Sequence, residues 1–163
     1  MSPKEKVTGF LKEKNIEFNE HPVKGDQFPP EDNFWKDRDI LRCKNLFFRD
    51  NHGKNHYLVI FNYYKKIDIK KLQDITGRGS MTMASGWRLE KYLGLKPGFI
   101  SIFGLLNDER NHVKVIIDKE LKQENELSFL PNTEGGSFIS LIFNDLLKFL
   151  EATGNDYQVE KVE

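Results

Sequence analysis

The sequence predicts a single α+β domain, in which a largely antiparallel, mixed sheet carries packed helices. Three observations lead to this prediction. Strand-like apolar runs recur along the whole chain, segments with helical spacing of apolar residues lie between them, and no linker or repeat divides the 163 residues. A chain of this length can bury a core without disulfide bridges. We therefore treat residues 1–163 as one domain.

The expected elements follow one another with short connections. Helices are recognised by periodic apolar residues, a capping residue at the start and a glycine at the end. Strands are recognised by short alternating or continuous apolar runs. The helices are expected at residues 2–15, 68–77, 85–94, 119–125 and 144–154. The strands are expected at residues 16–21, 43–50, 56–63, 80–84, 98–106, 113–118, 127–131, 137–143 and 157–162.

Two hairpins are expected among these strands. The turn at residues 50–55 contains Gly53, which suits a positive φ angle, and it separates two strongly apolar strands. The turn at 107–112 is expected to join the strand at 98–106 to the strand at 113–118 in the same way. Both hairpins favour antiparallel pairing.

One long loop is expected near the N-terminus. Residues 22–39 are rich in Pro and Asp, which disfavour regular structure. The large aromatic residues Phe34 and Trp35 in this segment are typical of a buried surface. We expect a loop or lid packed on the domain, with one helical turn.

Composition excludes several classes of function. The chain has 25 basic and 25 acidic residues, so it is not expected to coat duplex DNA by bulk charge, although it can still bind the end of an RNA. The single cysteine, Cys43, excludes a disulfide framework and a cysteine-type zinc site. The sequence shows no membrane-spanning apolar run and no signal peptide, so a cytoplasmic protein without a membrane partner is expected.

Lys44 stands out because it directly precedes a strand-like apolar run in the segment ILRCKNLFFRD. An ammonium carried into a buried strand must be paired or kept in water. Pattern alone favours a structural interpretation, in which the lysine stem covers apolar surface and the charged head reaches solvent. The functional alternative is a lysine held at the rim of a site.

Other candidate groups give weaker signals. Cys43 has no histidine near it in sequence and is expected to be a buried thiol on the opposite face from Lys44. The four histidines have no spacing typical of a metal site, and we expect them to be solvated turn residues. They are His21, His52, His56 and His112.

Two glycine-containing segments offer groups that can bind a ligand. Gly98 and Gly104 bracket the apolar segment expected as a strand, and backbone N–H groups beside a glycine can hold an oxyanion. In the turn at 131–136, Asn132 and Thr133 can hydrogen-bond a ligand. When each segment is taken alone, the end of a strand or ordinary turn chemistry is the favoured explanation.

A positively charged stretch lies in the middle of the chain. A solvated surface is its usual meaning, and a small phosphate-facing patch for a single-stranded RNA end is the alternative. Its members are Lys65, Lys66, Lys70, Lys71, Arg78, Arg88 and Lys91.

The order of the motifs is more specific than any one of them. The segments CKNLFFRDNHGKNHYLVIF, MTMASGWRLEKYLGLKPGFISIFGLLND and LSFLPNTEGGSFISL follow one another as they do in a known family. The chain resembles the ProX branch of the YbaK family, free-standing relatives of the editing domain of bacterial prolyl-tRNA synthetases. The resemblance covers nearly the whole chain and is loosest across residues 22–39.

The resemblance implies a function as well as a single YbaK-like domain. It implies a trans-editing deacylase that hydrolyses the ester of mischarged aminoacyl-tRNA, with alanine on proline tRNA as the typical substrate. It implies no metal and no cofactor. The expected partner is the acceptor end of the tRNA, with prolyl-tRNA synthetase as a further candidate.

The resemblance also implies which residues form the site. The family lysine falls on Lys44, at the pocket rim, and backbone N–H groups of the loop from Gly98 to Ile102 would stabilise the oxyanion while water attacks the ester. The implied catalytic residues are Lys44, Gly98 and Ser101. The implied substrate-binding residues are Asn45, Phe99, Ile100, Ile102, Leu130, Asn132 and Thr133.

Departures from the family pattern leave an alternative open. Ile102 stands where relatives usually have a proline, and Leu130 stands where they often have a histidine, in FLPN instead of FHPN. These changes put the amino acid specificity in question. A non-catalytic module of the same fold, which binds tRNA or a synthetase, remains the second hypothesis.

Overall fold

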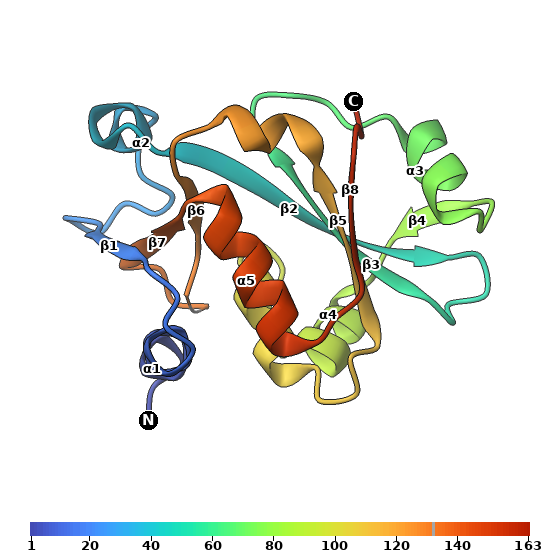
Figure 1. Cartoon of the computed structure of the whole chain (residues 1–163), viewed down its shortest axis with the longest axis horizontal. Helices are drawn as coiled ribbons and strands as arrows, with labels where there is room; N and C mark the ends of the chain where they lie inside the picture. The colour runs from blue at the N-terminus through green and yellow to red at the C-terminus, as the bar shows by residue number, and fades with distance from the viewer. Residues whose placement is uncertain (132) are drawn as a thin grey trace.

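The computed structural model describes residues 1–131 and 133–163. Within them, eight strands form one mixed sheet in the order β1-β7-β6-β2-β3-β5-β8, and β4 pairs with β2 outside this path (Figure 1). The strands are β1 (Asn19–Pro22), β2 (Leu41–Asp50), β3 (His56–Asn62), β4 (Met81–Met83), β5 (Val113–Asp118), β6 (Leu127–Phe129), β7 (Ser137–Leu141) and β8 (Tyr157–Glu160).

Helices cover both faces of this sheet (Figure 1). The α-helices are α1 (Pro3–Glu13), α2 (Asn33–Arg38), α3 (Ile69–Thr76), α4 (Gly86–Leu93) and α5 (Phe143–Thr153), and the 3₁₀ helices are η1 (Ile102–Asn107) and η2 (Lys119–Gln123). Helix α1 begins as its sequence indicates, because the Ser2 hydroxyl accepts a hydrogen bond of 3.1 Å from the Glu5 N–H.

Strand alternation divides the core between the two faces. Phe47 belongs to the larger core cluster, which includes residues of α1, α4, α5 and η1, whereas the next residue, Phe48, belongs to a smaller cluster with Leu72 of α3. A third cluster joins Phe34 and Trp35 of α2 to Phe138 of β7. The long strand β2 is therefore packed on both sides.

On one of its two edges, strand β2 pairs with neighbouring strands over only part of its length. On one side it pairs with β3 from Cys43 to Arg49. On the other side, β6 pairs only with Leu41 and Arg42, and β4 pairs only with Phe48 to Asp50. Among the described residues, the segment between these two pairings has no strand partner on that side. The gap leaves room for a pocket in the middle of the sheet.

The predicted fold class is confirmed, with one clear error in the strand assignment. The β2–β3 hairpin forms as expected, and Gly53 in its turn has a φ of 65°. The expected strand at 98–106 is wrong, because the segment forms a loop followed by η1. The hairpin expected between residues 98–106 and 113–118 does not form, because β5 pairs in parallel with β3 and with β8.

Smaller differences concern element ends and residues 22–39. The long segment before β2 is packed as predicted, since α2 supplies its helical turn and Trp35 is only 2% exposed. The first strand lies at Asn19–Pro22, later than expected, and pairs with β7. The short helix after β5 is a 3₁₀ helix, η2.

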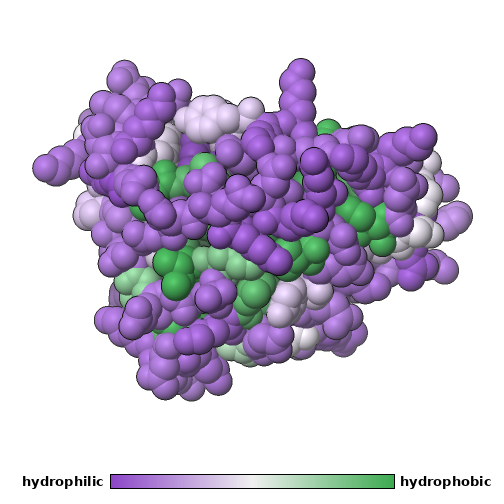
Figure 2. Space-filling view, turned by 45° about the horizontal axis from the view of Figure 1, so that its top comes forward, coloured by the Kyte–Doolittle hydropathy of each residue, from purple (hydrophilic) through white to green (hydrophobic). Residues whose placement is uncertain are grey.

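The surface is mainly hydrophilic on the face seen in Figure 2, with hydrophobic residues gathered in its central part. No helix among the described residues is long and apolar enough to cross a membrane.

Candidate active site

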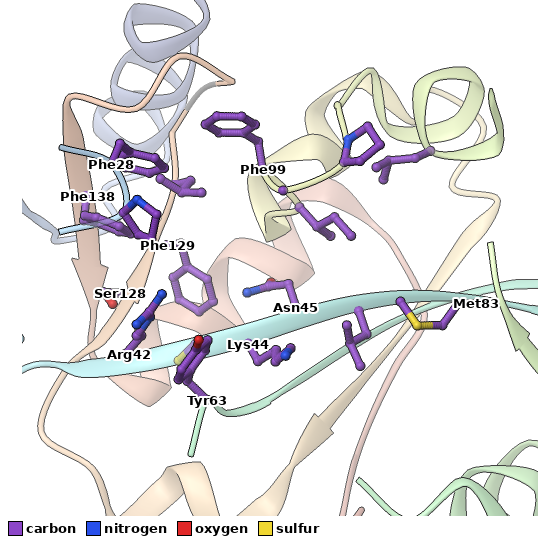
Figure 3. A pocket seen from close by; sticks show the side chains of 18 of the residues that line it. Phe28, Arg42, Lys44, Asn45, Tyr63, Met83, Phe99, Ser128, Phe129 and Phe138 are labelled. Atoms are coloured by element: carbon purple, nitrogen blue, oxygen red, sulfur yellow. The ribbon is translucent and has the colours of Figure 1, made fainter. Parts of the chain in front are cut away.

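A pocket of about 610 Å³ occupies the gap beside β2 (Figure 3). Its lining comes from β2, from the loop before η1, from the end of β6 and from residues near α2. Pockets of this size hold small-molecule ligands in many proteins. The pocket brings together segments that are far apart in the sequence, with the middle of β2 as its floor.

One wall of the pocket is aromatic. The Phe28 ring stacks on Phe99 at a centroid distance of 5.6 Å and on Phe138 at 6.0 Å. Gly135 allows the close approach of Phe28, because a Cβ atom at this position would lie 2.9 Å from the ring. These rings present a rigid apolar surface that excludes water from one side of a bound molecule.

The opposite part of the lining is cationic. Arg42 and Lys44 are two residues apart on β2 and therefore project to the same face. The Arg42 guanidinium carbon lies 3.7 Å from the centre of the Tyr63 ring and 4.3 Å from that of Trp35. No carboxylate is present among the described lining residues. The pocket is thus suited to a ligand that is apolar at one end and anionic at the other.

Lys44 keeps its charge available to a ligand. Its ammonium lies 5.3 Å from the centre of the Tyr63 ring, and it forms no ion pair with any residue that the structure describes. A cation near an aromatic face is held weakly and without neutralisation. Lys44, which stands out in the sequence, is therefore half-buried and lines the pocket.

Asn45 points into the pocket from the other face of β2 (Figure 3). Its Oδ1 atom is buried and has no hydrogen-bond partner in the described chain. A buried amide without partners is costly in a folded protein unless a ligand or water completes its hydrogen bonds. The carboxamide is therefore a candidate for direct contact with the substrate.

The loop before η1 supplies backbone donors. Gly98 has a φ of 87°, a conformation that favours glycine, and the N–H of Phe99 is used within the turn, where it donates to the Lys96 carbonyl at 3.0 Å. No hydrogen bond within the described chain occupies the N–H groups of Gly98 and Ile100. These two groups are available to an oxyanion at the pocket wall.

Most, but not all, of the expected site residues line the pocket. Ser101 and Ile102 do not, because the segment forms η1 where a strand was expected. The Ser101 hydroxyl caps η1 by accepting from the Phe103 N–H at 3.3 Å, and Ile102 is fully buried in the core. The expected residues that line the pocket are Lys44, Asn45, Gly98, Phe99, Ile100 and Leu130.

The turn after β6 contributes less than expected. Thr133 lines a different cavity, beside the N-terminus of α1, and not the pocket. Asn132 lies outside the described residues. Leu130, at the end of β6, lines the pocket. Among the described residues, it is the one expected site residue of this region that does so.

Several pocket residues were not predicted. Arg42 has a sequence signal, since it lies two residues before Lys44 in the same strand. Other lining residues come together only through tertiary packing, without a local signal in the sequence. Among them are Phe28, Tyr63 and Phe138.

Cys43 also lines the pocket, and burial strongly raises the pKa of its thiol. It packs against the larger core cluster, on the opposite face from Lys44, as the alternation predicts. A thiol with a raised pKa carries little thiolate at neutral pH. Cys43 is accordingly a packing residue, in agreement with the sequence-based expectation.

One prediction about the histidines is wrong. His56 is completely buried at the start of β3, where its ring stacks on Phe47. Its Nδ1 lies 2.8 Å from Nε2 of His112, and Arg88 lies 3.0 Å from its Nε2. Burial, His112 and the Arg88 guanidinium lower the pKa of His56 to about 4. None of these three residues lines the pocket, and Arg88 also donates a hydrogen bond of 3.2 Å to the Gly53 carbonyl in the turn of the β2–β3 hairpin.

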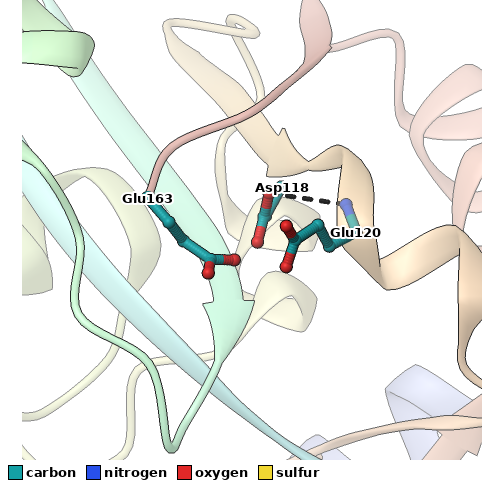
Figure 4. A group of neighbouring side chains, drawn as sticks. All are labelled: Asp118, Glu120 and Glu163. Carbon is teal, nitrogen blue, oxygen red and sulfur yellow. Dashed lines mark hydrogen bonds between the residues drawn. The ribbon is translucent and has the colours of Figure 1, made fainter.

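A cluster of three carboxylates lies at the end of β5 (Figure 4). Oxygen atoms of Asp118, Glu120 and Glu163 lie within 4.8 Å of one another, and the Lys65 ammonium pairs with Glu120 and, at 3.3 Å, with Glu163. A proton on Glu163 can be donated to Asp118, and this hydrogen bond, together with burial, raises the pKa of Glu163 to about 7. The lysine and this proton offset most of the negative charge of the cluster.

Comparison with known proteins gives the family. The profile of the aminoacyl-tRNA editing domain matches residues 38–149. A curated relative, the prolyl-tRNA editing protein ProX of Acetoanaerobium sticklandii, is 43% identical over 115 residues, which make up 71% of this chain and 70% of the relative. The chain belongs to the aminoacyl-tRNA editing domain family. Its class of enzyme is the aminoacyl-tRNA deacylase, a hydrolase that acts on an ester bond.

Solved structures show the same fold over the whole domain. The hypothetical protein APE2540 has a TM-score of 0.74 at 16% identity, with 96% of this chain and 98% of that chain covered. A protein described as a candidate trans-editing enzyme for prolyl-tRNA synthetase has a TM-score of 0.69 at 18% identity, with 100% and 99% covered. At these identities the likeness shows the fold alone.

Proposed function

We propose that this protein is a trans-editing deacylase that hydrolyses the ester of mischarged proline tRNA, with alanine as the amino acid removed. The observation that carries the proposal is the pocket beside β2, whose lining includes Lys44, with an ammonium that forms no ion pair, and Gly98 and Ile100, whose N–H groups no hydrogen bond of the described chain occupies. The 43% identity to a prolyl-tRNA editing protein, ProX, supports proline tRNA as the tRNA of the substrate. The choice of alanine as the amino acid rests on the likeness to the ProX branch.

In the proposed reaction, water attacks the carbonyl carbon of the ester that joins the amino acid to the terminal ribose. The negative charge that develops on the carbonyl oxygen is stabilised by the N–H groups of Gly98 and Ile100, with Lys44 at the rim. Loss of one such donor typically lowers the rate about 10²–10³-fold. A neighbouring ribose hydroxyl of the tRNA can carry the proton to the leaving oxygen.

No covalent nucleophile is needed for this chemistry, because the aminoacyl ester is already activated and positioning contributes strongly to the rate. The buried thiol of Cys43 is not a suitable nucleophile, since burial raises its pKa. The catalytic roles therefore fall on Lys44 and on the backbone of the loop at 98–100, with Asn45 as a substrate contact.

The expected partners follow from the reaction. The acceptor end of the tRNA enters the pocket, and prolyl-tRNA synthetase is a candidate partner because it produces the mischarged substrate. The proposal includes a cytoplasmic location, where charged tRNAs are used in translation. It requires no cofactor.

A non-catalytic module is the competing proposal, and one observation favours it. Leu130 lines the pocket at a position where relatives often have a histidine, so a polar group of the site is replaced by an apolar one. Ile102, the other departure, lies in the core and leaves the pocket lining unchanged. The argument for lost activity thus depends on Leu130 alone.

Deacylation of a panel of charged proline tRNAs distinguishes the two proposals. The panel carries alanine, cysteine, serine or the correct proline, and the release of each amino acid is followed with time. Preferential release of alanine supports the proposed function. Release of another amino acid corrects the specificity, and tight binding of every tRNA without release favours the non-catalytic module.

A further inference from the structure

We propose that Arg42 binds the phosphodiester group that precedes the terminal adenosine of the tRNA, at the cationic end of the pocket where the catalytic Lys44 also lies. The inference rests on the proposed function and deepens it, because it names the part of the substrate that the cationic end of the pocket takes. Arg42 directly precedes the segment CKNLFFRD, and the family resemblance implies no role for it.

The guanidinium of Arg42 is held in a fixed orientation. It lies 4.3 Å from the centre of the Trp35 ring and 3.7 Å from that of the Tyr63 ring, so it packs between two aromatic residues. Trp35 is itself fixed, since its Nε1 donates a hydrogen bond of 3.0 Å to the Ser128 hydroxyl. A preorganised arginine loses less conformational freedom when it binds an anion.

The guanidinium also has donors to spare. Its one acidic partner in the described chain is Asp32, at 3.6 Å, which is a long contact with a half-exposed side chain. The same Asp32 oxygen accepts a hydrogen bond of 2.7 Å from the Tyr64 hydroxyl. Because arginine carries five N–H donors, this arrangement leaves most of them free for a ligand.

Lys44 adds a second positive charge on the same face of β2. Tyr63 lies between the two cations, 3.7 Å from the Arg42 guanidinium carbon and 5.3 Å from the Lys44 ammonium. Two cations near one ring, without a carboxylate among the described lining residues, form a site for an anion. The planar guanidinium suits two oxygens of a phosphate, and the lysine supplies a point charge.

The substrate offers only one kind of anion in this region. An aminoacyl ester has no free carboxylate, so the negative charges nearest to the reacting carbonyl are those of the RNA backbone. A phosphodiester at the cationic end would leave the aminoacyl group to reach the aromatic wall and the loop donors. Arg42 is therefore assigned to substrate binding and not to the chemical step.

The test compares two small substrates that differ in one phosphate. These are the 3′-alanyl ester of adenosine 5′-monophosphate and the same ester of adenosine, each treated with wild type, Arg42→Met and Arg42→Lys. The matched control is Arg38→Met, because Arg38 also lies on an aromatic ring, 4.0 Å from that of Phe34, but does not line the pocket.

We expect Arg42→Met to lower kcat/KM about 10–100-fold for the phosphorylated substrate, the range for a charged hydrogen bond, and to leave the other substrate nearly unchanged. Arg42→Lys should recover part of the loss, and Arg38→Met should resemble wild type. If Arg42→Met lowers kcat/KM equally for both substrates, the role of Arg42 is structural. If kcat/KM is lowered for neither substrate, Arg42 does not bind the phosphate. Each of these results overturns the inference.

A binding measurement separates this inference from the proposed function. If wild type hydrolyses neither ester, the affinities for adenosine 5′-monophosphate and for adenosine are compared by calorimetry with the same variants. A preference for the phosphorylated nucleotide that disappears in Arg42→Met supports the subsite even without catalysis. An equal affinity for both nucleotides in wild type contradicts it.

Discussion

The ammonium of Lys44 lies 5.3 Å from the centre of the Tyr63 ring, without an acidic partner in the described chain. This relationship joins a residue of β2 to a residue just after β3, at the open side of the pocket. An unpaired cation that is kept near an aromatic face stays available to a substrate.

Gly98→Ala is expected to lower activity through the backbone. A Cβ atom at this position meets nothing within 4 Å, but the φ of 87° is strained for alanine, by about 1–2 kcal/mol. The loop should shift and move its N–H donors away from the oxyanion. We expect a lower kcat with a small change in KM, measured by steady-state deacylation.

Gly9→Ala is the matched control for this substitution. Gly9 lies inside α1, and a Cβ atom there also meets nothing within 4 Å. Alanine should stabilise this helix by about 0.5–1 kcal/mol and leave the kinetics unchanged. If Gly98→Ala has wild-type kcat, the loop does not supply donors to the reaction.

Leu130→His is expected to change the amino acid selectivity. The substitution restores the residue that related proteins often have, at a position that lines the pocket. A polar ring changes the size and hydrogen bonding of the pocket wall, which typically alters discrimination between similar amino acids by about 1–3 kcal/mol. The measurement is the ratio of kcat/KM values for alanyl and cysteinyl proline tRNA. An unchanged ratio would show that Leu130 does not contact the amino acid.

His56 is expected to remain neutral down to about pH 4 in the folded protein. Burial, His112 and Arg88 lower its pKa to about 4, below the ordinary value of 6.5. Because the unfolded chain binds this proton more readily, its contribution to stability is complete above pH 6.5 and is lost as the pH falls toward 4. Histidine chemical shifts measured by NMR against pH test the prediction. Titration of His56 between pH 6 and 7 would contradict it.

Glu163 should have the opposite effect on stability. Its pKa is raised from 4.5 to about 7 by the hydrogen bond with Asp118 and by burial, so the folded state holds its proton more tightly than the unfolded state. This contribution is present below about pH 4.5 and is lost as the pH rises through 7. Glu163→Gln should therefore gain in melting temperature relative to wild type between pH 5 and pH 8.

Glu160→Gln is the control for that comparison, because Glu160 is an exposed residue of β8. Its melting temperature should follow that of wild type at every pH. A constant difference between Glu163→Gln and wild type across this range would show that Glu163 does not share a proton with Asp118.

Local sequence signals predict the β2–β3 hairpin well. Turn chemistry at Gly53 and two continuous apolar strands are sufficient to identify it, and Lys44 is recognised because it interrupts this pattern. The same alternation places Cys43 on the opposite face, where the structure has it. These features depend on neighbours in the chain and not on the rest of the fold.

The error at residues 98–106 has a packing cause. Gly104 was interpreted as the end of a strand, but a Cβ atom there would lie only 2.6 Å from the Leu95 side chain, so the glycine allows η1 to pack closely. A buried 3₁₀ helix and a buried strand have the same apolar composition over a short run. Ser101, which the family resemblance implied as a site residue, instead caps η1 with its hydroxyl.

The pocket itself depends on long-range structure. Phe28 and Phe138 lie more than a hundred residues apart in the sequence, yet their rings stack at 6.0 Å. The burial of His56 also depends on long-range structure. Its position after a turn suggests an exposed side chain, but His56 pairs with Arg49 in β2 and with Val113 in β5 and is buried. Single-sequence patterns carry no information on such contacts.

The most direct test of the central claim is single-turnover deacylation of alanyl proline tRNA by wild type and Lys44→Ala. Lys66→Ala serves as the control, because Lys66 is an exposed lysine outside the pocket. The account predicts rapid alanine release by wild type and by the control, and a loss of about 10²-fold or more in Lys44→Ala, the size expected when one stabilising group is removed. Equal rates for wild type and Lys44→Ala would contradict it.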